Sequence, residues 1–418
     1  MPASKMWGGP PGPRPTPSSA SVFPVTEQPD QGARRGRGRP PHFESSSYRA
    51  ILFFLALSLP LILSADERWK MQFNYDKADS TLNIRDLQCP SAQRCIAAGV
   101  IFDKKGHGQG AVVVSSDGGQ KWATVDVKEE PISLFFLNDS TGWMVTDKGL
   151  WSTSESGRSW KKMEGWKKGI VRVHFRDPLH GYAIGFPKIV RETTDGGKNW
   201  TKLAEAAKPT TDAERTVYDC IAFLGNHGLI TGRVTPFSLE ETPIWMDPNT
   251  ARYRRERQSP TILLETLDGG QHWDSTTSSI FGHITQLRLT KEGTALALVE
   301  YEDYYALPST IYTIRFDNTR AGKVFAESDR AVRDVILLPS GRTILAAVEP
   351  TGRSNQVPIP GKLKMLESNN LKVWTEMDVD YRAVAQRAIL AAPDDHHVWV
   401  ATDTGMILQL VDTANTPK

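Results

Sequence analysis

The chain has 418 residues, of which 39% are hydrophobic and 23% charged, and its formal net charge is +2. These values are ordinary for a globular protein, and the length allows a large buried core. The near-neutral balance gives no reason to expect binding to nucleic acid.

Residues 1–49 differ in composition from the rest of the chain. They contain ten of the 27 prolines and few apolar residues, which predicts disorder. Seven Lys or Arg against three Asp or Glu give this segment a net charge of +4 and leave −2 for the remainder. We interpret the run RRGRGR at 34–39 as a solvated tail or a positive flank to the segment that follows, with binding of acidic partners as the alternative.

Residues 50–65, AILFFLALSLPLILSA, form an uncharged apolar run. A membrane-spanning helix needs about 20 residues, and Pro60 interrupts this run. Its length, the helix breaker and the small residue Ala65 favour a signal peptide, with an uncleaved membrane anchor as the alternative. In both cases the basic flank stays in the cytoplasm and the body is exported, to the periplasm or the extracytoplasmic face of the inner membrane.

Residues 66–418 are predicted to be all-β. Arg68–Phe73 alternates apolar and polar residues and indicates a single strand. Seven clusters of strands follow, at 84–125, 132–163, 170–203, 217–277, 284–324, 332–379 and from about 388. The last cluster has room for three strands only.

An octet of the form Ser/Thr-x-Asp-x-Gly-x-x-Trp recurs along this region, at 115–122, 193–200 and 266–273, with a variant at 153–160 and a degenerate copy ending at Trp374. Its acid can accept hydrogen bonds from its own turn, its second glycine can take a left-handed backbone conformation, and its tryptophan can pack on the neighbouring strands. Because the octet repeats, we interpret it as structural rather than catalytic. Its paired positions are Asp117 and Trp122, Glu155 and Trp160, Asp195 and Trp200, and Asp268 and Trp273.

The octet resembles the Asp box of the bacterial neuraminidase repeat, which forms the hairpin between the third and fourth strands of a β-propeller blade. The boxed acids are 38, 40 and 73 positions apart, and a repeat of about forty residues suits a four-stranded blade. The resemblance implies an all-β, seven-bladed propeller whose last blade is closed by the strand at Arg68–Phe73. Six or eight blades remain open, because the last three clusters lack clear boxes.

The sequence contains three cysteines. Cys89 and Cys95 flank PSAQR at a predicted turn, and we predict that they form a disulfide, with two free thiols as the alternative. Cys220 is expected to be buried. No pattern of metal ligands or phosphate-binding glycines is present, so no metal and no cofactor are expected.

Two classes of function compete. A sialidase-like glycosidase needs an arginine triad, a Tyr–Glu pair and an Asp acid, and usually has Arg-Ile-Pro before the first box. This sequence offers only Arg85, in NIRDL, at that place. Catalysis is therefore not expected.

The second class is a non-catalytic binding propeller. GYAIG and TTDGGKNW, within Gly181–Trp200, are similar to the repeat of the photosystem II assembly and stability factor family of cyanobacteria and chloroplasts. The resemblance covers residues 80–280 best. It implies an exported propeller that assists the assembly of a membrane protein complex. A sortilin-like ligand-binding propeller is a further alternative, and the partner itself stays unidentified.

Three insertions predict the binding surface. Pro236–Pro260, Tyr301–Ser309 and Thr351–Gly361 each separate the second and third strands of a cluster, and such connections all lie at the end of a propeller opposite the boxes. Tyrosine, tryptophan and arginine are frequent in binding hot spots, and arginine suits carboxylates. We predict that an acidic or extended segment of a partner protein binds there, through Arg233, Trp245, Arg252, Arg254, Arg255, Arg257, Tyr301, Tyr304 and Tyr305.

Overall fold

The computed structural model describes residues 67–235, 258–301, 307–315, 320–349, 353–354 and 357–412. All of them lie in the second of the two units into which the chain divides, residues 63–418. The predicted tail at 1–49 and the apolar run at 50–65 lie outside the described residues. Within the described ranges, no helix is long and apolar enough to cross a membrane.

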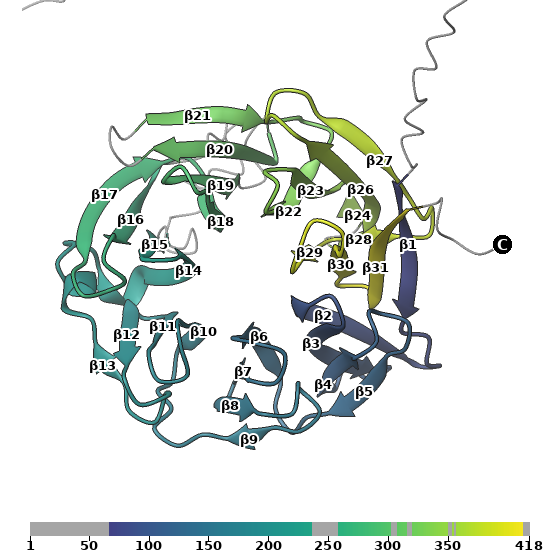
Figure 1. The fold of residues 1–418 in the computed structure, drawn as a ribbon, viewed down its shortest axis with the longest axis horizontal. Helices are drawn as coiled ribbons and strands as arrows, with labels where there is room; N and C mark the ends of the chain where they lie inside the picture. Colours follow the sequence, from purple (N-terminus) through teal and green to yellow (C-terminus); the bar gives the residue numbers. More distant parts are fainter. Residues whose placement is uncertain are drawn as a thin grey trace, which may run out of the picture. The chain divides into compact units, whose positions relative to one another are not determined.

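Five four-stranded antiparallel sheets follow one another around a ring, each with its first strand nearest the centre (Figure 1). We number them blades 1 to 5. Blade 1 has β2 (Ser80–Ser91), β3 (Arg94–Asp103), β4 (Gly108–Ser115) and β5 (Ala123–Asp126); blade 2 has β6 (Pro131–Phe136), β7 (Gly142–Thr146), β8 (Leu150–Thr153) and β9 (Lys161–Lys162). Blade 3 has β10 (Ile170–Phe175), β11 (Gly181–Gly185), β12 (Ile189–Thr193) and β13 (Thr201–Lys202); blade 4 has β14 (Thr216–Leu224), β15 (His227–Val234), β16 (Ser259–Thr266) and β17 (Asp274–Ile280). Blade 5 has β18 (His283–Leu289), β19 (Thr294–Glu300), β20 (Ser309–Arg315) and β21 (Arg320–Phe325).

The remaining part of the ring is one larger sheet in the order β22-β23-β26-β27-β1-β31-β30-β29. Its strands are β22 (Ala331–Leu337), β23 (Thr343–Val348), β26 (Gly361–Ser368), β27 (Thr375–Val379), β29 (Ala388–Ala391), β30 (Trp399–Thr402), β31 (Met406–Asp412) and β1 (Glu67–Asn74). The short elements outside this order are η1 (Ala204–Ala207), η2 (Ala213–Arg215), β24 (Arg353–Ser354), β25 (Val357–Pro358) and β28 (Val384–Ala385).

The closure by the N-terminal strand is confirmed. β1 pairs antiparallel with β31 from Glu67↔Asp412 to Asn74↔Met406. It also meets β27 in a parallel contact of two residue pairs, Arg68↔Asp378 and Trp69↔Val379. This short contact lies between two four-stranded parts of the sheet, which we name blade 6 (β22, β23, β26, β27) and blade 7 (β29, β30, β31, β1).

The core lies between the blades. The second strands β7 (GWMVT) and β11 (GYAIG) are buried along their whole length, because a neighbouring blade covers each of their faces. The buried apolar residues form seven clusters, and each cluster joins two neighbouring blades. Continuous apolar runs of this kind are the sequence signal from which the seven groups of strands were predicted.

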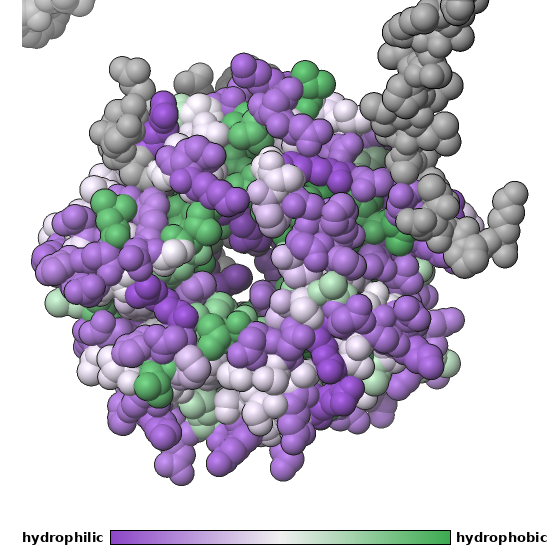
Figure 2. Space-filling view, viewed as in Figure 1, coloured by the Kyte–Doolittle hydropathy of each residue, from purple (hydrophilic) through white to green (hydrophobic). Residues whose placement is uncertain are grey.

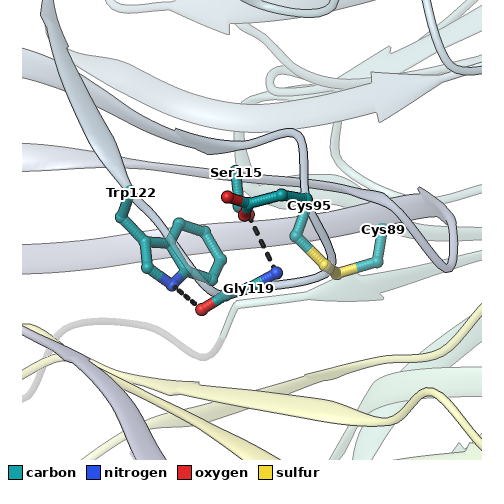
Figure 3. Close-up of a disulfide and its surroundings, with 6 residues drawn as sticks. Cys89, Cys95, Ser115, Gly119 and Trp122 are labelled. Atoms are coloured by element: carbon teal, nitrogen blue, oxygen red, sulfur yellow. Dashed lines mark hydrogen bonds between the residues drawn. A yellow bond between two sulfur atoms is a disulfide. The ribbon is translucent and has the colours of Figure 1, made fainter.

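The Asp box is a self-contained hydrogen-bonded turn. In blade 1 the Ser115 hydroxyl donates to the Asp117 carboxylate (3.0 Å) and accepts from the Gly119 N–H (2.9 Å). Asp117 also accepts from the Lys121 N–H at 2.9 Å, and Gly119 has a φ of 88°. The Trp122 indole N–H donates to the Gly119 carbonyl at 3.0 Å (Figure 3).

Each box also packs against the preceding blade. Trp122 of blade 1 lies 6.0 Å from Phe73 of blade 7, ring centre to ring centre. Trp273 of blade 4 lies 5.4 Å from Tyr182 of blade 3 in an edge arrangement. The box is therefore a structural link between blades.

The degenerate copy before Trp374 is a shortened box. The Ser368 hydroxyl accepts from the Leu371 N–H at 2.9 Å, and Asn370 accepts from the backbone of the two residues after Leu371. Leu371 has a φ of 59°, so it takes the left-handed conformation that the box glycine takes elsewhere.

Cys89 and Cys95 form a disulfide at the turn between β2 and β3, beside the first box (Figure 3). Cys220 is a free, buried thiol. Burial raises its pKa to about 12.

Candidate functional site

The ring has two ends, which we name by their connections. The Asp-box face carries the boxes and the turns between first and second strands. In blade 1 the Gly118 N–H of the box donates to the Gln93 carbonyl of the turn between β2 and β3, so the box and this turn lie side by side. The loop face carries the turns between second and third strands and the links from one blade to the next. The three insertions predicted from the sequence all belong to the loop face, because they follow β15, β19 and β23.

A ring of backbone irregularities surrounds the channel near the loop face. The innermost strands of blades 1 to 6 each shift register by one residue in their pairing with the second strand. Such bulges turn side chains away from the sheet. They leave Arg85, Asp219 and Arg333, among others, out of the ladder.

The residue after the bulge often bonds the next blade. The Asp86 carboxylate accepts from the Leu134 N–H at 2.8 Å, and Asp334 accepts from the Leu390 N–H at the same distance. The Ser133 hydroxyl donates to the Val171 carbonyl at 2.8 Å. These buried bonds fix the blades around the channel.

Five arginines lie on the strands around the loop-face end of the central channel, which we call the channel mouth. Four of them are paired: Arg85 with Glu130 (3.1 Å), Arg233 with Asp219 (3.0 Å), Arg288 with Asp334 (3.2 Å) and Arg333 with Glu300 (2.6 Å). Arg172 of β10 forms no hydrogen bond or ion pair with any described residue.

Arg172 lies toward the axis of the ring. Burial raises the pKa of the carboxyls of Asp86, Asp219 and Asp334, and the positive charge of Arg172 opposes this shift at all three. Because these carboxyls belong to blades 1, 4 and 6, a side chain from blade 3 acts on all of them only from near the centre. Hydrophilic residues border much of the central opening in Figure 2.

In the described part of the channel mouth, four of these five arginines are thus paired with acids, and Arg172 is the one without an acidic partner. Arg172 is partly exposed. Within the described ranges, no group of three or more His, Cys, Asp or Glu could hold a metal ion.

A cleft of about 420 Å³ opens at the loop face between blades 1 and 2. Its acid Glu129 accepts from the Thr146 hydroxyl (2.6 Å), the Trp151 indole (2.8 Å) and the Lys162 ammonium (2.5 Å). These bonds, above all that from Lys162, outweigh burial and lower its pKa. Glu129 is therefore held as an ion by its three donors.

The predicted binding residues are only partly described. Arg233 lies on β15 and bonds Asp219, and the Tyr301 hydroxyl lies 3.2 Å from that of Tyr312 on β20. Both therefore contribute to the packing of their own blades. Trp245, Arg252, Arg254, Arg255, Arg257, Tyr304 and Tyr305 lie outside the described residues. The sequence analysis did not identify Arg172. The only feature of the sequence that could have pointed to it is its place near the start of β10, the first strand of blade 3.

The Asp boxes, the four-stranded sheets and the ring make this chain an Asp-box β-propeller. Two solved structures share the fold. One, described as "YCF48 bound to D1 peptide", has a TM-score of 0.54 at 16% identity and covers 84% of this chain and 97% of that one. YCF48 from Cyanidioschyzon merolae has a TM-score of 0.53 at 13% identity, covering 83% and 99%.

Sequence comparisons point the same way. Residues 152–237 match the family "Photosynthesis system II assembly factor YCF48". The photosystem II assembly lipoprotein Ycf48 of Synechococcus sp. CC9902 is 26% identical over 151 residues, 32% of this chain and 44% of that protein, so the match spans less than half of that relative. The protein of the same name from Parasynechococcus marenigrum is 22% identical over 58% of this chain and 73% of its own length. The chain therefore resembles photosystem II assembly factors, in sequence over residues 152–237 and in its propeller fold.

Proposed function

We propose that this chain is an exported, non-catalytic assembly factor that binds an extended segment of a membrane protein at its loop face. The observation that carries the proposal is the match of residues 152–237 to the assembly factor family. A structural relative bound to a D1 peptide supports a partner of this class. The sialidase-like and sortilin-like alternatives are not favoured by these comparisons.

The loop face has the chemistry for such a segment. Arg172 offers unpaired donors near the axis, and a guanidinium binds a carboxylate through two parallel hydrogen bonds. The arginines at 252, 254, 255 and 257 belong to an insertion that begins and ends on this face. The disulfide near the first box agrees with an oxidising, extracytoplasmic location.

The test uses overlapping synthetic peptides that cover the exposed segments of D1. Fluorescence anisotropy measures whether each peptide binds the chain. Reversal of three charges, Arg252→Glu, Arg254→Glu and Arg255→Glu, is expected to weaken binding of the captured peptide at least tenfold while the melting temperature stays unchanged.

The matched control reverses three exposed charges at the tips of the boxes, Lys121→Glu, Arg158→Glu and Lys198→Glu. These changes alter the net charge equally but lie on the Asp-box face, so binding should persist. Loss of binding in the control alone would show that the partner uses the other face. Absence of binding by the unmodified chain to every peptide would remove D1 as the partner.

A further inference from the structure

The charge of residues 50–418 is unevenly distributed. Residues 158–202 contain eleven Lys or Arg against four Asp or Glu, a net charge of +7, so the rest of residues 50–418 carries −9. This basic segment comprises the end of the second box, the fourth strand of blade 2, the link to blade 3 and blade 3 itself. The positive charge is therefore concentrated in one sector of the ring.

Much of this charge is carried by exposed lysines on the outer rim of blades 2 and 3. β9 and β13 are the outermost strands of these blades (Figure 1). The exposed lysines lie on these two strands, on the link between the blades and on the box of blade 3, and none of them forms an ion pair with another described residue: Lys161, Lys167, Lys168, Lys198 and Lys202. We call these five lysines the basic rim. The neighbouring Lys162 differs from them, because it is paired with Glu129.

The link between the two blades is a tight turn packed against blade 3. It is bounded by Gly165 and Gly169, whose φ angles of 77° and 91° lie in the left-handed region. A Cβ at Gly165 would collide with the Lys198 carbonyl, and a Cβ at Gly169 would collide with the Phe186 carbonyl. The link, the box of blade 3 and the turn between β11 and β12 therefore form one continuous surface.

Two aromatic side chains lie within this surface. Trp166, between the two glycines, is half-buried and packs on the apolar cluster shared by blades 2 and 3. Phe186 is 41% exposed, and its N–H donates to the Gly169 carbonyl at 2.9 Å. Aromatic rings beside lysines are typical of protein surfaces that lie at the boundary between water and lipid.

The chemistry of the basic rim favours a lipid surface over the fixed groups of a folded partner. Recognition of a single carboxylate or phosphate relies on the planar guanidinium of arginine, whereas all five cations here are lysines on flexible stems. Such point charges on the outer circumference of a ring suit a layer of mobile anionic headgroups. The same layer repels the negative remainder of the chain, so electrostatics alone turns this rim toward the lipid.

We propose that the basic rim docks the propeller on the surface of an anionic bilayer. The lysine ammonium groups lie among the phosphates of phosphatidylglycerol, and Trp166 and Phe186 lie at the level of the headgroups. The ring then stands on its edge, with the loop face perpendicular to the bilayer. A segment that rises from the membrane can run along that face, which extends the proposed function, but the docking itself does not require it.

The test compares the distance to lipid of two positions in the full chain. Vesicles of phosphatidylcholine and phosphatidylglycerol contain a lipid with a nitroxide at its headgroup, and two variants carry a fluorophore at Thr201→Cys or at Thr375→Cys. Both threonines are exposed and directly follow a box tryptophan, in blade 3 and in blade 6 across the ring (Figure 1). The native cysteines are bonded or buried, so in the folded chain only the new thiol reacts.

We expect the nitroxide to reduce fluorescence several-fold more at position 201 than at position 375. The difference should vanish in vesicles of phosphatidylcholine alone, because the anionic headgroups are missing. It should also vanish when three charges of the basic rim are removed by Lys161→Gln, Lys167→Gln and Lys168→Gln. The comparison concerns two sites of one fold, so it does not depend on how other segments of the chain associate with the vesicles.

The matched control removes three exposed lysines of blades 6 and 7 by Lys70→Gln, Lys362→Gln and Lys372→Gln. It changes the net charge equally and should retain the quenching difference. All variants should melt at the temperature of the unmodified chain, because each altered lysine is exposed.

Equal quenching at the two positions, a difference that persists without phosphatidylglycerol, or loss of the difference in the control overturns the proposal. Loss of the difference on addition of inorganic phosphate at constant ionic strength also overturns it, because the lysines would then form a site for free phosphate. Absence of quenching at both positions overturns it in favour of an acidic protein partner. Peptide binding in the same vesicles reports on the proposed function separately, because it can fail while the quenching difference remains.

Discussion

Trp69 is the side chain through which the N-terminal strand closes the ring, so its removal tests the closure directly. It is 1% exposed and packs between blades 6 and 7 with Met365, Met377 and Leu410. Its indole N–H donates to the Met377 sulfur at 3.4 Å. Truncation of a buried tryptophan to alanine costs about 3–5 kcal/mol. We therefore expect Trp69→Ala to lower the free energy of unfolding by about 4 kcal/mol.

Thermal unfolding followed by circular dichroism measures this loss. An unfolding entropy of about 2.1 cal/mol/K per residue gives about 0.7 kcal/mol/K for a propeller of this size, so the melting temperature should fall by about 5–6 °C. The control is Tyr381→Ala, a side chain that is 81% exposed, which should change stability by less than about 0.5 kcal/mol. A chain that begins at Asn74 lacks the whole strand and should lose more than either variant. If Trp69→Ala melted like the control, β1 would not be an integral strand of the last blade.

Two further predictions concern the box and the disulfide. Hydrogen bonds, first of all that from the Asn199 N–H, lower the pKa of Asp195 to about 2, so this box contributes stability above about pH 4 that is lost as the pH falls toward 2. In the Asp195→Asn variant the melting temperature should therefore decrease less between about pH 4 and pH 2 than in the wild type. The control is Asp139→Asn, which replaces an exposed acid in another turn and should leave this decrease unchanged. Replacing Cys89 and Cys95 by serine should cost about 2 kcal/mol, the value for so short a loop. Alkylation of the unfolded wild-type chain should modify one thiol without reductant and three with it, and three in both cases would show that the bond is absent.

Local patterns were sufficient to predict much of the fold. The box predicted its own hairpin because Asp117, Gly119 and Trp122 bond one another within eight residues. The strand containing Trp69 was recognisable as unpaired because the last cluster lacked a fourth strand.

The channel mouth could not be predicted in the same way. Asp86 and Asp334 look like ordinary strand residues, and their bonds to Leu134 and Leu390 form only when blades close around an axis. The bulge before Arg172 breaks the alternation of apolar and polar residues at Ile170–Val171, but this break alone does not show that Arg172 lies near the axis. Contacts between neighbouring repeats thus decide the site, while contacts within one repeat make the hairpins of the fold recognisable.

The pairing of β1 with β31 also sets an order of events during synthesis. Trp69 emerges early, but its neighbour Met377 lies 308 positions later, and β31 is made after that. Until β31 is made, β1 lacks its antiparallel partner and has only the two-pair contact with β27, so an edge of β1 stays uncovered. Long-range pairing of this kind slows folding and exposes strand edges to aggregation. The first strand to be synthesised is therefore among the last to find its place in the ring.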